Sequence, residues 1–129
     1  MNTAANWFIQ NKLQRAQSAF TTAMSRMRRA RNLRELMQGR NVHVESFVHC
    51  LVRSEESRAD RLREELATTM VEAHLKEIET LPLDQRQAKI GEFMRRDWCF
   101  LRGNEPRLYR RIEVESARLT RDLPRPPLP

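Results

Sequence analysis

The chain has 129 residues, of which 40% are hydrophobic, 32% charged and only 6% aromatic, and its formal net charge is +7. This length suits a single domain with a modest core. Three glycines are too few for a β-sandwich or barrel with its frequent turns, so the composition favours an all-α protein. No stretch approaches 18 continuous apolar residues, and we therefore expect no transmembrane segment.

The positive charge favours an acidic partner: nucleic acid, an anionic membrane surface or an acidic protein. The basic side chains are nearly all arginine, since lysine occurs only at positions 12, 76 and 89. Arginine makes planar bidentate contacts with phosphate, which leans toward nucleic acid. A GC-rich genome gives the same bias, so the two explanations stay open.

The first 38 residues predict one long helix, residues 3–38, with Gly39 at its end. No glycine or proline interrupts Thr3–Met37. Apolar residues repeat at alternating spacings of four and three, which is typical of a coiled-coil seam. The seam consists of Ile9, Leu13, Ala16, Phe20, Ala23, Met27 and Ala30.

A second helix of similar length is predicted over residues 42–80, and it ends before Pro82. It is rich in acids, whereas the first forty residues hold eight bases and one acid, Glu35. A tight turn at 39–41 would make the two helices an antiparallel hairpin and bring Arg26 close to Ser54–Glu56. Ion pairs between arginines of the first helix and acids of the second would help to set the register of the hairpin.

Two shorter helices follow, residues 85–102 and 106–122. The inward face predicted for the first consists of Ala88, Phe93, Met94, Trp98 and Leu101. Leu108, Ile112 and Leu119 share one face of the second. The last stretch, residues 123–129, is proline-rich and is expected to be extended. The prediction is a single all-α domain, residues 1–122: a long antiparallel helical hairpin plus two shorter helices, bundle-like, with an extended tail.

Two short helices cannot cover two helices that are each roughly 50 Å long. We therefore expect part of the first helix's seam to be exposed and to bind a second copy or a stable partner. The partner interface assigned from the sequence is Ile9, Leu13, Phe20 and Met27.

The candidate nucleic-acid-binding residues centre on the arginine-rich stretch Ser25–Arg40. At 100° per residue, five cations fall within an arc of about 100° on one side of the first helix. They are Lys12, Arg15, Arg26, Arg29 and Arg40. Such a stripe would grip phosphates without reading sequence. The alternative is a cationic face that the chain neutralises with its own acids.

A second basic group surrounds the aromatic residues Phe93, Trp98, Phe100 and Tyr109. It consists of Arg95, Arg96, Arg102, Arg107, Arg110 and Arg111. Arginines interleaved with aromatic rings can bind single strands by stacking. At these helical spacings Phe93 and Trp98 fit a core better, and Tyr109 is the candidate for an exposed ring.

No catalytic, cofactor or metal signature is present, so we expect a non-enzymatic protein without a cofactor. His49 and Cys50 are adjacent and therefore point about 100° apart on a helix, which disfavours a nucleophile–base pair. His43, His74 and Cys99 meet no zinc spacing. Two cysteines outside any disulfide framework predict free thiols in a reducing intracellular compartment, either the cytoplasm or the nucleoid or nucleus. The basic, acid-free start also resembles a mitochondrial presequence, a minority alternative.

Two functions are consistent with these patterns. The first is a small basic protein that binds RNA or duplex nucleic acid through phosphates with little sequence specificity. The second is a non-catalytic assembly or adaptor subunit that docks by its helical hairpin into a larger complex, as a homo-oligomer or with an acidic protein.

Overall fold

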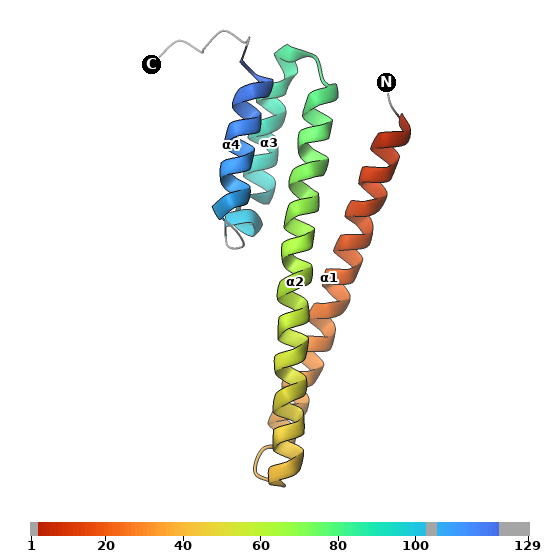
Figure 1. Cartoon of the computed structure of the whole chain (residues 1–129), viewed down its shortest axis with the longest axis vertical. Helices are drawn as coiled ribbons and strands as arrows, with labels where there is room; N and C mark the ends of the chain where they lie inside the picture. The colour runs from red at the N-terminus through yellow and green to blue at the C-terminus, as the bar shows by residue number, and fades with distance from the viewer. Residues whose placement is uncertain (1–2, 103–105, 122–129) are drawn as a thin grey trace. The chain divides into compact units, whose positions relative to one another are not determined.

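The computed structural model describes residues 3–102 and 106–121, and within these ranges the chain is entirely α-helical apart from turns, as predicted (Figure 1). The helices are α1 (Thr3–Met37), α2 (Val42–Thr80), α3 (Leu83–Arg102) and α4 (Pro106–Leu119). Helix α3 begins two residues before its predicted start at 85, and α4 ends three residues before its predicted end at 122. Helix ends are less sharply defined than helix interiors, because their last turns fray. The proline-rich tail, 123–129, lies outside the described residues. No helix in the described ranges is long and apolar enough to cross a membrane.

The chain divides into two compact units, which are described separately. The hairpin unit is Gln14–Leu66, and the second unit combines Met1–Leu13 with Ala67–Pro129. The single-domain assignment from the sequence stays a prediction.

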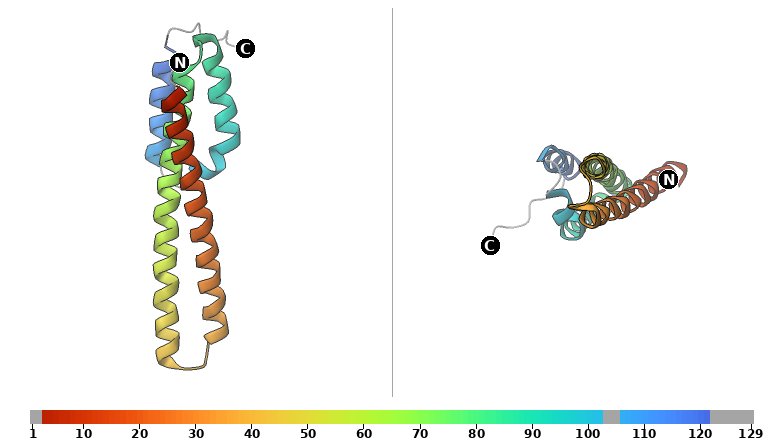
Figure 2. Two further views of the ribbon diagram at one scale, coloured as in Figure 1. Left: turned by 90° about the vertical axis from the view of Figure 1, so that its right-hand side faces the viewer. Right: turned by 90° about the horizontal axis from the view of Figure 1, so that it is seen from below.

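The hairpin unit is the antiparallel pair formed by the end of α1 and the start of α2, joined by a short turn (Figure 2). One seam of buried side chains joins the two helices. It consists of Ala23, Met27 and Ala59, followed by Ala30, Val48 and Val52 nearer the turn. Half of these side chains are alanine, so each turn of helix buries little apolar surface.

The turn is closed by hydrogen bonds from both of its sides. Gly39 has φ of 79°, a left-handed conformation that glycine adopts without a Cβ penalty, as its predicted place at the helix end requires. The Asn41 side-chain oxygen accepts a hydrogen bond from the His43 backbone N–H at 2.8 Å and caps α2. The Glu45 carboxylate accepts another from the Gly39 N–H. These contacts confirm the predicted hairpin.

The second unit has a core in which α3 and α4 pack on each other and on the end of α2. Its buried side chains are Ala67, Val71, Phe93, Leu101, Leu108 and Ile112. Most inward positions predicted for α3 and α4, Leu119 included, are thus confirmed, with Met94 partly buried against this core. The prediction was wrong for Ala88, which is exposed, and the side chain of Trp98 lies outside the described residues.

Arg86 of α3 ties helix ends together within the second unit. Its Nε donates to the Leu81 carbonyl at 3.1 Å and its Nη2 to the Glu79 carbonyl at 3.2 Å, at the end of α2. Its Nη1 donates to the Leu119 carbonyl at 2.9 Å, at the end of α4. The last carbonyls of a helix lack partners within the helix and carry its negative dipole end, so a guanidinium is well suited to both.

His74 of α2 is buried against α3. Its ring stacks on Phe93 with centroids 3.5 Å apart and planes at 12°, and its Nε2 has no hydrogen-bond partner among the described residues. Burial, with the nearby positive charges of Arg96 and Lys89, lowers the pKa of His74 from 6.5 to about 4. The imidazole is therefore neutral in the folded protein at physiological pH.

Replacing Arg86 with Ala should lower the free energy of unfolding by about 2–3 kcal/mol, because three charge-assisted hydrogen bonds to carbonyls are lost. Arg86→Lys should recover less than half of this loss, since a single ammonium cannot span the three acceptors. The measurement is urea unfolding followed by circular dichroism. Arg95→Ala, an exposed arginine on the same helix, is the matched control and should change stability by less than about 0.5 kcal/mol. Equal losses for Arg86 and Arg95 would contradict the role given to Arg86.

His74 should make the fold sensitive to acid. The folded pKa lies below the unfolded value, so the unfolded chain binds the proton more readily and stability is lost as pH falls from about 6.5 toward 4. The loss should approach about 1.4 kcal/mol per pH unit at its steepest. His74→Leu should remove this part of the pH dependence, measured as the difference from the wild type in urea unfolding at several pH values. His49→Leu, at an exposed position, serves as the control and should keep the wild-type profile.

Candidate functional site

Two arginines of the basic stretch are paired with acids of α2 inside the hairpin unit. Arg26 Nη2 lies 3.3 Å from Glu55 Oε1, and Arg31 Nε lies 3.4 Å from Glu56 Oε1. The predicted opposition of Arg26 to Ser54–Glu56 is thus confirmed. Part of the positive charge that the sequence displays is neutralised within the chain.

Glu55 differs from the other acids because its residue is only 9% exposed. One carboxylate oxygen faces Arg26, while the other, Oε2, is buried and has no hydrogen-bond partner among the described residues. A carboxylate removed from water needs its partner far more than an exposed one does. The Arg26 guanidinium is half exposed, so this pair sits at the edge of the seam.

The remaining arginines that α1 contributes to the hairpin unit are open to solvent. Arg15, Arg28, Arg29 and Arg34 are exposed, and none forms an ion pair with a described residue. These cations are available to an external anion.

The predicted five-residue stripe is divided by the structure. Arg15, Arg26 and Arg29 lie on the part of α1 inside the hairpin unit, with Arg26 engaged by Glu55. Arg40 is exposed but follows the end of α1, and the left-handed turn at Gly39 means that helical spacing does not place it. Lys12 belongs to the second unit, where its Nζ lies 3.3 Å from Glu72 Oε2.

The outward face of α1 carries hydrogen-bond donors that the charge pattern alone did not reveal. At 100° per residue, five exposed hydroxyl and amide side chains share an arc of about 100° with Arg15 and Arg29. They are Gln14, Ser18, Thr22, Ser25 and Asn32. Between residues 14 and 34 this helix has no acid. The face is uniformly cationic or neutral, and nothing on it repels an anion.

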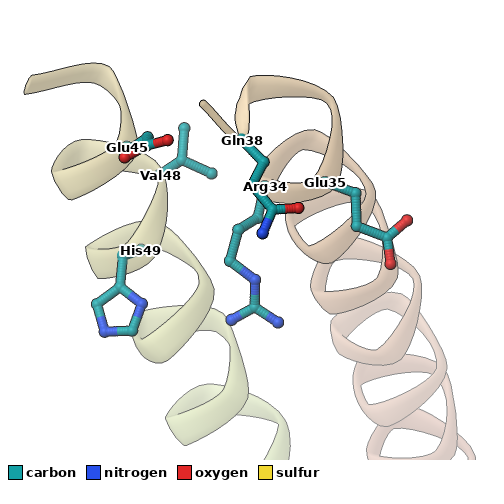
Figure 3. A pocket seen from close by; sticks show the side chains of 6 residues that line it. All are labelled: Arg34, Glu35, Gln38, Glu45, Val48 and His49. Carbon is teal, nitrogen blue, oxygen red and sulfur yellow. The ribbon is translucent and has the colours of Figure 1, made fainter. Parts of the chain in front are cut away.

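A hollow of about 470 Å³ lies between the helices near the turn (Figure 3). It is lined by Arg34, Glu35 and Gln38 from α1 and by Glu45, Val48 and His49 from α2. Arg34 extends into the space between the helices, whereas Glu35 points away from α2 (Figure 3). The charges are mixed and no nucleophile lines the hollow, so its residues define no catalytic arrangement.

A second hollow of about 280 Å³ opens beside the same seam. It is lined by Arg26, Arg29, Ala30 and Leu33 from α1 and by Leu51 and Glu55 from α2. Apolar walls and two guanidinium groups therefore meet in one depression.

The four residues assigned to a partner interface differ in how deeply they are buried and in which unit they lie. Met27 is only 7% exposed and packs with Ala23 and Ala59, so it serves the hairpin's own seam rather than an exposed surface. Phe20 is half-buried, and the Arg63 guanidinium lies 5.6 Å from its ring centroid. Ile9 and Leu13, in the second unit, are half-buried.

The largest exposed apolar side chains lie elsewhere. In the hairpin unit they are Leu36, Val42, Val44 and Phe47, and in the second unit Trp7, Phe8 and Val114. Val44 and Phe47 are three residues apart, so they share one face of α2. Their exposure is decided by which face of α2 meets α1.

The second basic group does not form an exposed stacking platform from the rings that the structure describes. Phe93 is buried and Phe100 is half-buried against the same core. The side chains of Trp98 and Tyr109 lie outside the described residues. In the described ranges no three His, Cys, Asp or Glu side chains gather as a metal site would require, and the Cys99 side chain is not among those described.

Comparison with known proteins yields no match to a family model, to a curated protein or to a solved structure.

Breaking the Arg26–Glu55 pair from one side should be costlier than removing it altogether. Arg26→Ala leaves the buried Glu55 carboxylate without its partner and should destabilise the protein by about 1–2 kcal/mol. The double variant Arg26→Ala with Glu55→Leu should be about as stable as the wild type, because the exposed guanidinium contributes little by itself. Urea unfolding of the single and double variants provides the coupling energy. Arg31→Ala, whose partner Glu56 is more exposed, should cost less than Arg26→Ala.

Proposed function

We propose that the protein is a small, non-enzymatic, basic nucleic-acid-binding protein that grips the phosphates of RNA or duplex through the outward face of α1 in the hairpin unit. The observation that supports it is that Arg15 and Arg29 are exposed and form no ion pair with a described residue, on a helix surface with no acid between residues 14 and 34. Phosphate binding needs positive charge that the protein has not already neutralised.

The contacts offered by this surface are of the phosphate-directed kind. Arg15 and Arg29 are fourteen residues apart on the same face, a separation of about 21 Å along the helix. Ser18, Thr22 and Ser25 lie between them and can donate hydrogen bonds to phosphate oxygens, which position a backbone without reading bases. The expected binding is therefore salt-dependent and tolerant of sequence.

A second candidate function is a non-catalytic assembly or adaptor subunit. It is favoured by the exposed apolar side chains near the turn, with Phe47 and Leu36 each 69% exposed. Isolated exposed apolar residues are ordinary, but several large ones gathered in a two-helix unit are typical of a protein-contact surface. Phosphate contact would not involve these side chains.

Binding to a random duplex of about 20 base pairs should weaken steeply as potassium chloride rises from 50 to 200 mM, with log K linear in log salt. The double variant Arg15→Ala with Arg29→Ala should weaken binding by roughly tenfold or more and reduce the slope by about 2, one unit for each lost phosphate contact. Fluorescence anisotropy measures both quantities.

The matched control is Arg53→Ala with Arg61→Ala, which removes the same charge from exposed positions on α2. It should leave most of the affinity and the slope intact. Equal effects of the two double variants would show attraction by net charge alone, and unchanged binding by the α1 variant would refute the proposed surface.

A further inference from the structure

The hairpin unit has an apolar face beside its seam that its two helices cover only in part, since Leu33 and Leu51 are partly buried against the seam. Leu33 of α1 and Leu51 of α2 line the smaller hollow from opposite sides. One helical turn from each, on the same faces at 100° per residue, lie Leu36 and Phe47. Both of these are 69% exposed. We call these four side chains the side face.

The side face is bordered by positive charge. Arg26 and Arg29 line the hollow together with Glu55, whose one partnered oxygen is already used by Arg26. Arg29 forms no ion pair with a described residue, so the border retains a net positive charge. An apolar face next to unneutralised guanidinium groups is complementary to an amphipathic helix that carries acidic side chains along one edge.

We propose that the side face docks an acidic amphipathic helix of a partner protein, which lies along the hairpin as a third helix. Two helices bury only one seam, and a third helix laid in the groove between them buries two more. Apolar side chains of the partner helix would contact Leu33, Leu36, Phe47 and Leu51. The carboxylates of the partner helix would contact the guanidinium of Arg29 and the solvent-exposed part of the Arg26 side chain.

A second copy of this chain is a poorer occupant on electrostatic grounds. The hairpin unit holds eleven arginines and seven acids, a net charge of +4, so two copies would bring like charges together. Its acid-rich helix, α2, uses Glu55 and Glu56 for pairs within its own hairpin. The charge argument therefore selects an acidic partner.

This proposal does not depend on the phosphate-binding function. Its apolar determinants make no phosphate contact, and Arg15, needed for phosphate binding, does not line the side face. Phe47→Ser should weaken docking of the helix while duplex binding persists. Arg15→Ala should weaken duplex binding while docking of the helix persists.

The test uses the full chain and a synthetic helical probe of about 21 residues, six turns, with leucines on one face and glutamates along its edges. A matched probe carries lysines in place of the glutamates. Fluorescence anisotropy should show micromolar binding of the acidic probe and at least about tenfold weaker binding of the basic one. Leu36→Ser and Phe47→Ser should each weaken binding of the acidic probe by about tenfold.

Val114→Ser is the matched control, because Val114 is 66% exposed on α4 in the second unit. It should leave probe binding unchanged. Both tested side chains are exposed, so their replacement should preserve the circular dichroism spectrum; if one variant loses helicity, the other decides the outcome.

Equal binding of the acidic and basic probes, or unchanged binding by the folded serine variants, would overturn the proposal. Sedimentation analysis at about 10 µM addresses the second copy. A dimer that Phe47→Ser dissociates would assign the side face to self-association and would likewise overturn the acidic partner.

Discussion

The turn at Gly39–Asn41 is the constraint on which the hairpin unit depends. A left-handed glycine ends α1, and the Asn41 cap starts α2 within four residues. The chain then has no freedom to choose another register, and the antiparallel partners follow by counting outward from the turn. Arg26 meets Glu55 for this reason, and Ala23 meets Ala59 across the same seam.

The composition of the seam explains why this unit leaves large apolar side chains exposed. Alanines at Ala23, Ala30 and Ala59 let the helices approach but bury little apolar area. Larger side chains, such as Leu36 and Phe47, point away from the seam and are exposed. The second unit differs, because α3 and α4 supply further faces and the Arg86 guanidinium satisfies carbonyls at two helix ends.

Charge in the hairpin unit is divided between arginines paired within the chain and arginines exposed to solvent. Arginines on the flanks of α1 that reach α2 are paired, as Arg26 and Arg31 are, and so contribute to register. Arginines that face outward, such as Arg15 and Arg29, are exposed and form no ion pair with a described residue. The same helix thus stabilises the fold with one side and presents cations with another. This division follows from helical periodicity together with the position of a single neighbour.

Local sequence determined the helices, the Gly39 turn and the antiparallel register of this protein, because helix periodicity, capping and turn chemistry act over a few residues. Phe93 and Ile112 were assigned to the core from spacing alone for the same reason. Only the tertiary structure decided that Met27 is buried, that Phe47 is exposed, and that Lys12 is paired while Arg29 forms no ion pair with a described residue. It also revealed Arg86, whose three acceptors come from residues 79, 81 and 119. Periodicity states which residues share a face, but burial and charge pairing depend on what packs against that face, and that is set by contacts between residues distant in the chain.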